Sequence, residues 1–127
     1  MQQGWQWPVA APITSRFGMR DGRPHEGVDL AVADGTEVRA AAAGRVVYAG
    51  SKLRGYGNLV MLRHQGGLLT VYAHNSRLLV GAGAAVGKGQ PIARSGHSGR
   101  ASAPHLHFEV RERDVPRDPE LYLPPHP

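Results

Sequence analysis

The chain has 127 residues, of which 41% are hydrophobic, and these values fit one folded domain and exclude a disordered segment. It contains no cysteine, which excludes disulfides and thiolate metal sites, so any bound metal must use histidine and carboxylate ligands. The net charge of +5 is spread along the chain without a run of five like charges, so we expect a solvated basic surface and no nucleic-acid site. No apolar stretch approaches the ~20 residues of a membrane span.

The chain begins with Met-Gln-Gln-Gly-Trp-Gln-Trp-Pro. No basic segment is followed there by an apolar one, so we do not expect these residues to act as a signal peptide. This start is consistent with a cytoplasmic protein and also with a domain of a longer exported protein.

Glycine and proline interrupt the chain at short intervals, and β-branched and aromatic residues fill the segments between them. This pattern, without a sustained helical period, predicts an antiparallel all-β domain. The clearest hairpin runs from Asn58 to His74, because the turn Gln65-Gly66-Gly67 offers the positive φ of a tight loop. The proline-rich tail from residue 116 is expected to be an extended strap with a frayed end. The predicted strands lie near residues 12–17, 27–32, 36–40, 44–49, 58–64, 68–74, 90–94 and 105–112.

The first histidine pattern is His25-Glu26-Gly27-Val28-Asp29. Imidazole and carboxylate groups are both good zinc ligands. Pro24 and Gly27 argue against a helix, so the two side chains would have to converge from a bend at Gly27. A polar surface turn that binds nothing is the alternative interpretation.

The second pattern is His105-Leu106-His107, in a segment that continues as Phe-Glu-Val. Alternate residues of a strand share a face, so His105, His107 and Glu109 are expected to point one way. Leu106, Phe108 and Val110 are then expected to point into the core. Two imidazoles on such a strand can hold a metal or a reacting group, and a solvated outer face is the alternative.

Two further histidines follow less specific patterns. His74 ends the predicted hairpin, where alternation places it on the face of Thr70 and Tyr72, opposite Val71. His97 lies in a glycine-flanked loop just before the His105 strand, where it can line a cleft or stay a solvated loop residue.

Eight segments of the chain form a combined pattern. They are Pro8 to Arg20 (Pro-Val…Ile-Thr-Ser-Arg-Phe-Gly-Met-Arg), His25-x-Gly-x-Asp29, Gly35-Thr-x-Val-x-Ala, Gly44-Arg-Val-Val, Gly55-Tyr-Gly-Asn58, Tyr72-Ala-His74, Gly89-Gln and Pro104-His-Leu-His-Phe-Glu109. In this order they resemble the lysostaphin-type (LytM-like) zinc metallopeptidases of peptidoglycan. The resemblance covers about residues 7–121.

The resemblance implies a mainly-β, sandwich- or barrel-like domain of the duplicated-hybrid-motif type, with a groove across a large antiparallel sheet. We therefore expect one metallopeptidase domain over residues 1–127, with a core at about 7–121 and a frayed tail at 122–127. The resemblance also implies a peptidoglycan substrate, and hence a periplasmic or extracellular place in the cell envelope. An upstream domain of a longer protein is also expected.

By resemblance, His25, Asp29 and His107 are the ligands of one zinc ion per chain, and His74 and His105 are catalytic histidines that do not bind it. Three protein ligands leave a tetrahedral position open, and zinc can lower the pKa of a bound water to about 7. One of the two catalytic histidines would act as base and acid and the other would stabilise the oxyanion, in an order that the residues leave open.

The remaining expectations concern the groove and the general base. Tyr72, His97 and Asn58 are expected to line the substrate groove. Glu26 follows His25 as in the H-E-x-x-H motif, but position 29 is aspartate, so Glu26 is expected to be a surface turn residue.

The expected function is hydrolysis of peptide bonds in peptidoglycan stem peptides or cross-bridges. One alternative is a non-catalytic peptidoglycan-binding module or amidase activator, although such relatives usually lose metal ligands and this chain keeps all of them. A second alternative is a phosphocarrier of the sugar phosphotransferase system, whose glucose-specific carrier also has His-x-Gly-x-Asp. The His105-x-His107 pair is not expected in that carrier.

Overall fold

The computed structural model describes residues 4–126, without the side chains of residues 19 and 20. Residues 1–3, at the start of the segment considered as a signal peptide, and residue 127, at the end of the expected tail, lie outside the described residues. The described part of the chain contains no helix that is long and apolar enough to cross a membrane.

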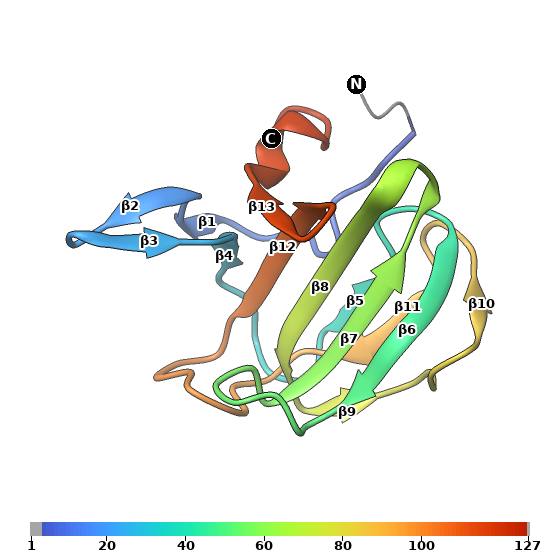
Figure 1. Ribbon diagram of the computed structural model, residues 1–127. Helices are drawn as coiled ribbons and strands as arrows, with labels where there is room; N and C mark the ends of the chain where they lie inside the picture. The colour runs from blue at the N-terminus through green and yellow to red at the C-terminus, as the bar shows by residue number, and fades with distance from the viewer. Residues whose placement is uncertain (1–3, 127) are drawn as a thin grey trace.

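A large antiparallel sheet forms the main layer of the molecule (Figure 1). Its strands lie in the order β1-β4-β12-β8-β7-β6-β10, and β13 pairs with β12. Among the described residues this order has two ends, so the sheet does not close into a barrel. The bounds are β1 Ile13–Ser15, β4 Val28–Leu30, β12 Leu106–Glu112, β8 Leu68–Asn75, β7 Asn58–Arg63, β6 Gly44–Gly50, β10 Ala85–Val86 and β13 Val115–Arg117.

A smaller three-stranded sheet contributes the other side of the hydrophobic core. It contains β5 (Glu37–Arg39), β11 (Pro91–Arg94) and β9 (Arg77–Leu78), in that order. Its Val38 and Ile92 are fully buried in one cluster with Tyr72 and Phe108 of the large sheet. The prediction of a mainly-β antiparallel domain is confirmed.

The opposite face of the large sheet carries a second, smaller apolar cluster. Its buried members, Leu59, Val71 and Ala73, are accompanied by partly buried aromatic and aliphatic side chains. His107 and Glu109 share this face, because they stand opposite Ala73 and Val71 in the β8–β12 register. The alternation predicted for β12 is therefore confirmed, with its aliphatic and aromatic residues in the core.

Each of the eight predicted strands has a counterpart, and the central hairpin is β7, the 3-10 turn η1 (Gln65–Gly67) and β8. Gly66 and Gly67 have φ of 81° and 77°, as the turn requires. The short strands β9, β10 and β13 were not predicted from the sequence. The hairpin of β2 (Gly18–Arg20) and β3 (Arg23–His25), which projects from one side of the sheet, was not predicted either (Figure 1).

The tail is more structured than the predicted strap, since it contains β13 and a second 3-10 helix, η2 (Pro119–Leu121). Beyond η2, Leu123 is buried and the carbonyl of Pro124 accepts a hydrogen bond from the Trp7 indole at 2.9 Å. The tail thus packs on the N-terminal segment, and the domain boundary at residue 121 stays a prediction.

Candidate metal centre

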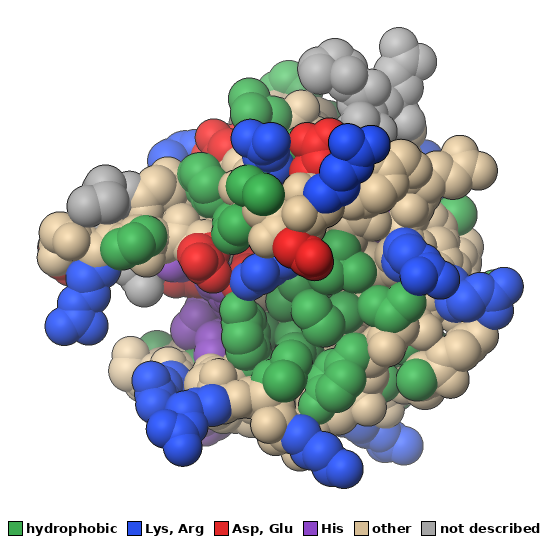
Figure 2. Space-filling view, in the orientation of Figure 1, with side chains coloured by type: hydrophobic (Ala, Val, Ile, Leu, Met, Phe, Trp, Pro, Cys, Tyr) green, Lys and Arg blue, Asp and Glu red, His purple; other side chains and the backbone are tan. Residues whose placement is uncertain are grey.

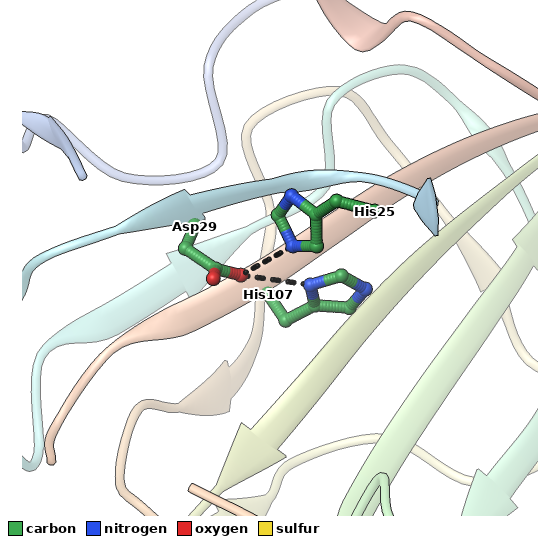
Figure 3. A group of neighbouring side chains, drawn as sticks. All are labelled: His25, Asp29 and His107. Carbon is green, nitrogen blue, oxygen red and sulfur yellow. Dashed lines mark hydrogen bonds and ion pairs between the residues drawn. The ribbon is translucent and has the colours of Figure 1, made fainter. Parts of the chain in front are cut away.

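The bend between β3 and β4 brings His25 and Asp29 onto the large sheet. A Cβ atom at Gly27 would lie 2.3 Å from the Phe108 carbonyl oxygen, so only glycine lets the chain pass β12 this closely. Asp29 then pairs with His107 across the β4–β12 register. The side chains of His25, Asp29 and His107 converge at this point (Figure 3).

The three side chains offer ligand atoms within 4.8 Å of one another. Asp29 Oδ1 lies 3.4 Å from His25 Nε2 and 2.8 Å from His107 Nδ1. Ligands of a tetrahedral zinc ion, each 2.0–2.1 Å from the metal, lie roughly 3.4 Å apart. The donor set therefore fits zinc, and the distance between His25 and Asp29 matches this spacing. The shorter distance between Asp29 and His107 is that of a hydrogen bond.

The protonation of His25 gives an independent reason to expect a cation. Its Nδ1 lies 2.9 Å from the Arg16 carbonyl oxygen, so this nitrogen carries the proton and donates it. Nε2 then keeps a lone pair, is buried and has no hydrogen-bond partner in the described structure. A lone pair that faces a carboxylate without a proton between them is unfavourable, and a metal ion between them would resolve it.

The charges of the site influence one another strongly. Burial raises the pKa of Asp29, but the hydrogen bond and charge of His107, with the charges of His25 and His105, outweigh it and hold that pKa well below its usual range. Burial lowers the pKa of His107, but hydrogen bonds to Asp29 and Glu109 outweigh it and raise the pKa to about 9. The aspartate is therefore ionised, and without a metal the His107 ring holds an extra proton between two carboxylates.

His74 and His105 stand beside this group. Their rings are 4.8 Å apart, and the His74 ring is 6.1 Å from that of His107. Each Nδ1 faces a backbone carbonyl oxygen, that of Ser98 at 2.7 Å for His74 and that of Ala103 at 3.0 Å for His105. Both Nδ1 atoms therefore donate, which leaves both Nε2 atoms as acceptors in the neutral rings.

The face predicted for His74 was wrong. Tyr72 points into the core, where its hydroxyl accepts a hydrogen bond from the Ala41 N–H, and His74 lies on the opposite face with His105. The reason is the backbone of His74, whose φ of +69° interrupts strand alternation at the end of β8. Burial is the largest influence on His74 and lowers its pKa.

A cleft of about 850 Å³ opens above these side chains. His25, Asp29, His74, His105 and His107 all line it. Figure 2 shows histidine side chains in the hollow between the projecting hairpin and the loops below it. The structure therefore brings together all five residues that the resemblance assigned to the metal and to catalysis.

The three residues predicted for the substrate groove lie elsewhere. Tyr72 is fully buried on the core side of the sheet. The side-chain amide of Asn58 donates a hydrogen bond to the Asn75 carbonyl oxygen at 3.0 Å. His97 is exposed and lies 3.1 Å from Asp34, outside the residues that line the cleft. Glu26 is half exposed beside Arg111, in agreement with a surface turn residue.

Three residues without a predicted function support His107 from the side away from Asp29: Tyr56, Glu109 and Arg111. Glu109 Oε2 accepts hydrogen bonds from His107 Nε2 at 2.7 Å and from the Tyr56 hydroxyl at 3.0 Å. Arg111 Nε donates to Glu109 Oε1 at 2.8 Å. Burial and the charge of Glu109 raise the pKa of Tyr56 to about 12, so its hydroxyl keeps its proton. Strand alternation had placed Glu109 beside His107, which was the available signal.

Comparison with known proteins settles the family. Residues 23–119 match the sequence model of peptidase family M23. The chain belongs to peptidase family M23. Its M23 domain superposes on the catalytic domain of lysostaphin from Staphylococcus simulans with a TM-score of 0.82 and 32% identity, covering 88% of this chain and 91% of that one. A zinc-containing peptidase from Vibrio cholerae gives a TM-score of 0.85 and 34% identity over 99% of this chain and 41% of the other.

Curated relatives of this M23 chain include proteins of the bacterial envelope. The outer membrane antigenic lipoprotein B of Haemophilus influenzae is 46% identical over 122 residues, which are 96% of this chain and 30% of the relative. The murein hydrolase activator NlpD of Escherichia coli is 42% identical over 120 residues, which are 94% of this chain and 31% of the relative. The chain therefore spans less than a third of either relative.

Proposed function

We propose that this M23 domain is a zinc-dependent endopeptidase that hydrolyses peptide bonds of peptidoglycan stem peptides or cross-bridges. One observation carries the proposal: three convergent metal-ligand side chains lie beside two further histidines on the floor of one cleft. A structural metal site has no need of unligated histidines next to an open coordination position. Membership of a peptidase family also favours this function over the phosphocarrier alternative.

His25, Asp29 and His107 would hold the ion through Nε2, a carboxylate oxygen and Nδ1 respectively. When bound, zinc supplies a Lewis acid and a water of lowered pKa. The hydrogen bonds from His25 Nδ1 to Arg16 and from His107 Nε2 to Glu109 fix both rings, so that each presents one ligand nitrogen to the site.

His74 and His105 would carry the proton transfers. The carbonyls of Ser98 and Ala103 hold both rings in the tautomer whose Nε2 accepts a proton, and burial keeps His74 neutral near pH 7. One ring takes the proton of the attacking water and delivers it to the leaving amine. The other ring would take a proton from solvent at Nε2 and donate it in a hydrogen bond to the oxyanion of the substrate.

The proposal includes the cell envelope, periplasmic or extracellular, as the place of action, and a longer parent protein with an upstream domain. Two points support it: relatives are named as an outer membrane lipoprotein and a murein hydrolase activator, and this chain spans only about 30% of their length. Peptidoglycan peptides are the proposed partner.

The test uses purified protein that is loaded with one zinc ion per chain and incubated with peptidoglycan. We expect new amino groups and shortened or uncross-linked peptides by mass spectrometry, and no products after chelation or with His107→Ala. Zinc-loaded protein that releases no peptide from peptidoglycans of differing cross-bridge chemistry would refute the proposal.

A second function, activation of another murein hydrolase without catalysis, is supported by the 42% identity to a protein named as such an activator. The two functions separate in one experiment with an added amidase. An activator would increase amidase products equally with the wild-type protein and with His74→Ala, whereas the proposed endopeptidase would produce its own peptides and lose them in His74→Ala.

A further inference from the structure

We propose that Glu109 is a positioning residue for the metal centre, and that Tyr56 and Arg111 keep its carboxylate in place. This inference rests on the proposed zinc function. Glu109 is only 1% exposed, and a carboxylate is rarely buried so completely unless it is paired.

The hydrogen bonds of Glu109 determine which nitrogen of His107 is free. Because its Oε2 accepts from His107 Nε2 at 2.7 Å, Nε2 keeps its proton, and Nδ1, which lies 2.8 Å from Asp29 Oδ1, is the nitrogen that would exchange its proton for a metal ion. The Tyr56 hydroxyl and Arg111 Nε occupy further acceptor positions of the same carboxylate. Glu109 therefore has no freedom to turn away from His107.

Arg111 extends the arrangement to the protein surface. Its guanidinium lies 3.3 Å from the exposed Glu26 carboxylate, as well as against Glu109. Glu26 offers a matched control. It is also a carboxylate that pairs with Arg111, but in the described structure the hydrogen bond of His107 Nε2 goes to Glu109 and not to Glu26.

A glutamine at position 109 would disturb the ring in either orientation. If the glutamine carbonyl faces His107, its amide N–H group faces the Arg111 N–H, and two donors meet. If the glutamine amide faces His107, it favours the tautomer of His107 with the proton on Nδ1, the proposed ligand atom. Loss of such a supporting partner typically costs about 10–100-fold in metal affinity.

The experiment measures zinc affinity by competition with a chromophoric chelator, with the absorption spectrum of the cobalt-substituted protein as a second readout. We expect Glu109→Gln to bind zinc about 10–100-fold more weakly with a changed cobalt spectrum, and Glu26→Gln to match wild type. Tyr56→Phe keeps the carboxylate and removes one donor, so it should also weaken zinc binding, but less than Glu109→Gln does. This variant replaces Glu109→Gln as the test if Glu109→Gln does not fold.

The inference would be overturned if folded Glu109→Gln bound zinc as tightly as the wild type. If Glu109→Gln does not fold, the same result in Tyr56→Phe would overturn it. The proposed function fails separately, if the wild-type protein binds no zinc or binds it without hydrolysing peptidoglycan.

A different observation, on the rim of the cleft, carries a second inference. We infer that Arg54 and Arg100 bind a carboxylate of the substrate, so the preferred peptide is an acidic stem cross-link and not a neutral glycine bridge. Both residues line the cleft and are exposed, and neither has an ion pair among the described residues. Glu26, also a lining residue, is instead balanced by Arg111.

The two arginines stand on loops that are fixed against each other. The Arg100 N–H donates to the Gly55 carbonyl at 3.1 Å, and a Cβ at Gly57 would lie 2.4 Å from Ser98 Oγ. Figure 2 shows Lys and Arg side chains gathered on the rim below the histidines. Such guanidinium groups suit a carboxylate, with which they form paired hydrogen bonds.

The test compares two synthetic cross-linked peptides that differ only in a free or an amidated carboxylate near the scissile bond. We expect a kcat/KM about tenfold higher for the free acid, because a hydrogen bond to a charged group contributes enough energy for such a ratio. The double variant Arg54→Gln/Arg100→Gln should lose this preference, and Arg63→Gln, at the far end of β7, should keep it. An equal preference in wild type and double variant would overturn the inference. Fluorescence anisotropy measures the binding affinity of both labelled peptides without turnover. A protein that binds the free acid more tightly but does not hydrolyse it would contradict the proposed function and not this inference.

Discussion

Histidines are buried in two regions of this molecule, and the two regions use them in opposite ways. At one end of the hairpin, His64 Nδ1 lies 2.8 Å from the Ala43 carbonyl oxygen and Nε2 lies 2.7 Å from Thr70 Oγ1. The Thr70 hydroxyl continues to that of Tyr72 at 2.9 Å, which accepts from the Ala41 N–H. Both ring nitrogens are used within the fold.

In the cleft, each histidine uses one nitrogen for the fold and leaves the other for the site. His25, His74 and His105 are held at Nδ1 by backbone carbonyls, and His107 is held at Nε2 by Glu109. Burial alone therefore does not identify a functional histidine; what distinguishes the cleft is the ring nitrogen that the fold leaves free. Four substitutions test this distinction.

The largest effect is expected for His25→Ala, which removes a ligand nitrogen and leaves Asp29 and His107 alone. We expect zinc content to fall from one ion per chain to near zero and peptidoglycan hydrolysis to fall below detection, because two ligands do not hold a catalytic zinc. Metal analysis after gel filtration and product analysis give the two readouts. Full zinc occupancy in the variant would exclude His25 from the ligand set.

The next effect is expected for His74→Gln, which removes a proton-transfer group and keeps all three ligand side chains. We expect turnover to drop by roughly 10²–10⁴-fold, with zinc content unchanged. The pair of results separates chemistry from metal binding: loss of zinc in His74→Gln would show that His74 is a ligand or a structural support of the site.

Much of the fold followed from local rules, and the departures have physical causes. The central hairpin and the alternation of β12 were predicted because the turn glycines and the apolar period agree there. The β2–β3 hairpin was missed because its strands are three residues long and too polar or glycine-rich to show a period.

For the site, the pattern of histidines and aspartate was sufficient to name the residues but not to orient them. The side of the sheet on which His74 lies depends on a single positive φ, which strand alternation cannot anticipate. The groove residues failed for a related reason: His97 is adjacent to the site in sequence, but its loop turns it toward Asp34. The positions of loops depend on contacts between distant segments, and composition does not encode these.

The structural region gives a stability prediction from His64→Gln. Replacing the ring leaves one of the buried hydrogen-bonding groups of Thr70 and Ala43 without its partner. The free energy of unfolding at pH 7.5, measured by urea denaturation, should therefore fall by about 1–3 kcal/mol. Zinc affinity should stay that of the wild type, because none of the cleft histidines contacts His64. A lowered zinc affinity would show that the two regions are coupled.

The same variant tests a pH dependence. Desolvation outweighs the hydrogen bond to Ala43 and lowers the pKa of His64 from its ordinary 6.5. Below pH 6.5 the unfolded chain binds a proton that the folded chain resists, so His64 contributes most above that pH and less as the pH falls through its folded pKa. The stability difference between wild type and His64→Gln should therefore shrink between pH 7.5 and pH 5.5, and a constant difference would contradict a neutral, buried ring.

The smallest effect is expected for His97→Ala, which separates closeness in sequence from participation in the site. His97 is exposed, its contact with Asp34 is a surface pair of little energy, and it does not line the cleft. We expect unfolding free energy to change by less than about 0.5 kcal/mol and both zinc affinity and turnover to match wild type. A loss of turnover with zinc retained would place the His97 loop against the bound peptide, and the cleft would then extend past the side chains that line it here.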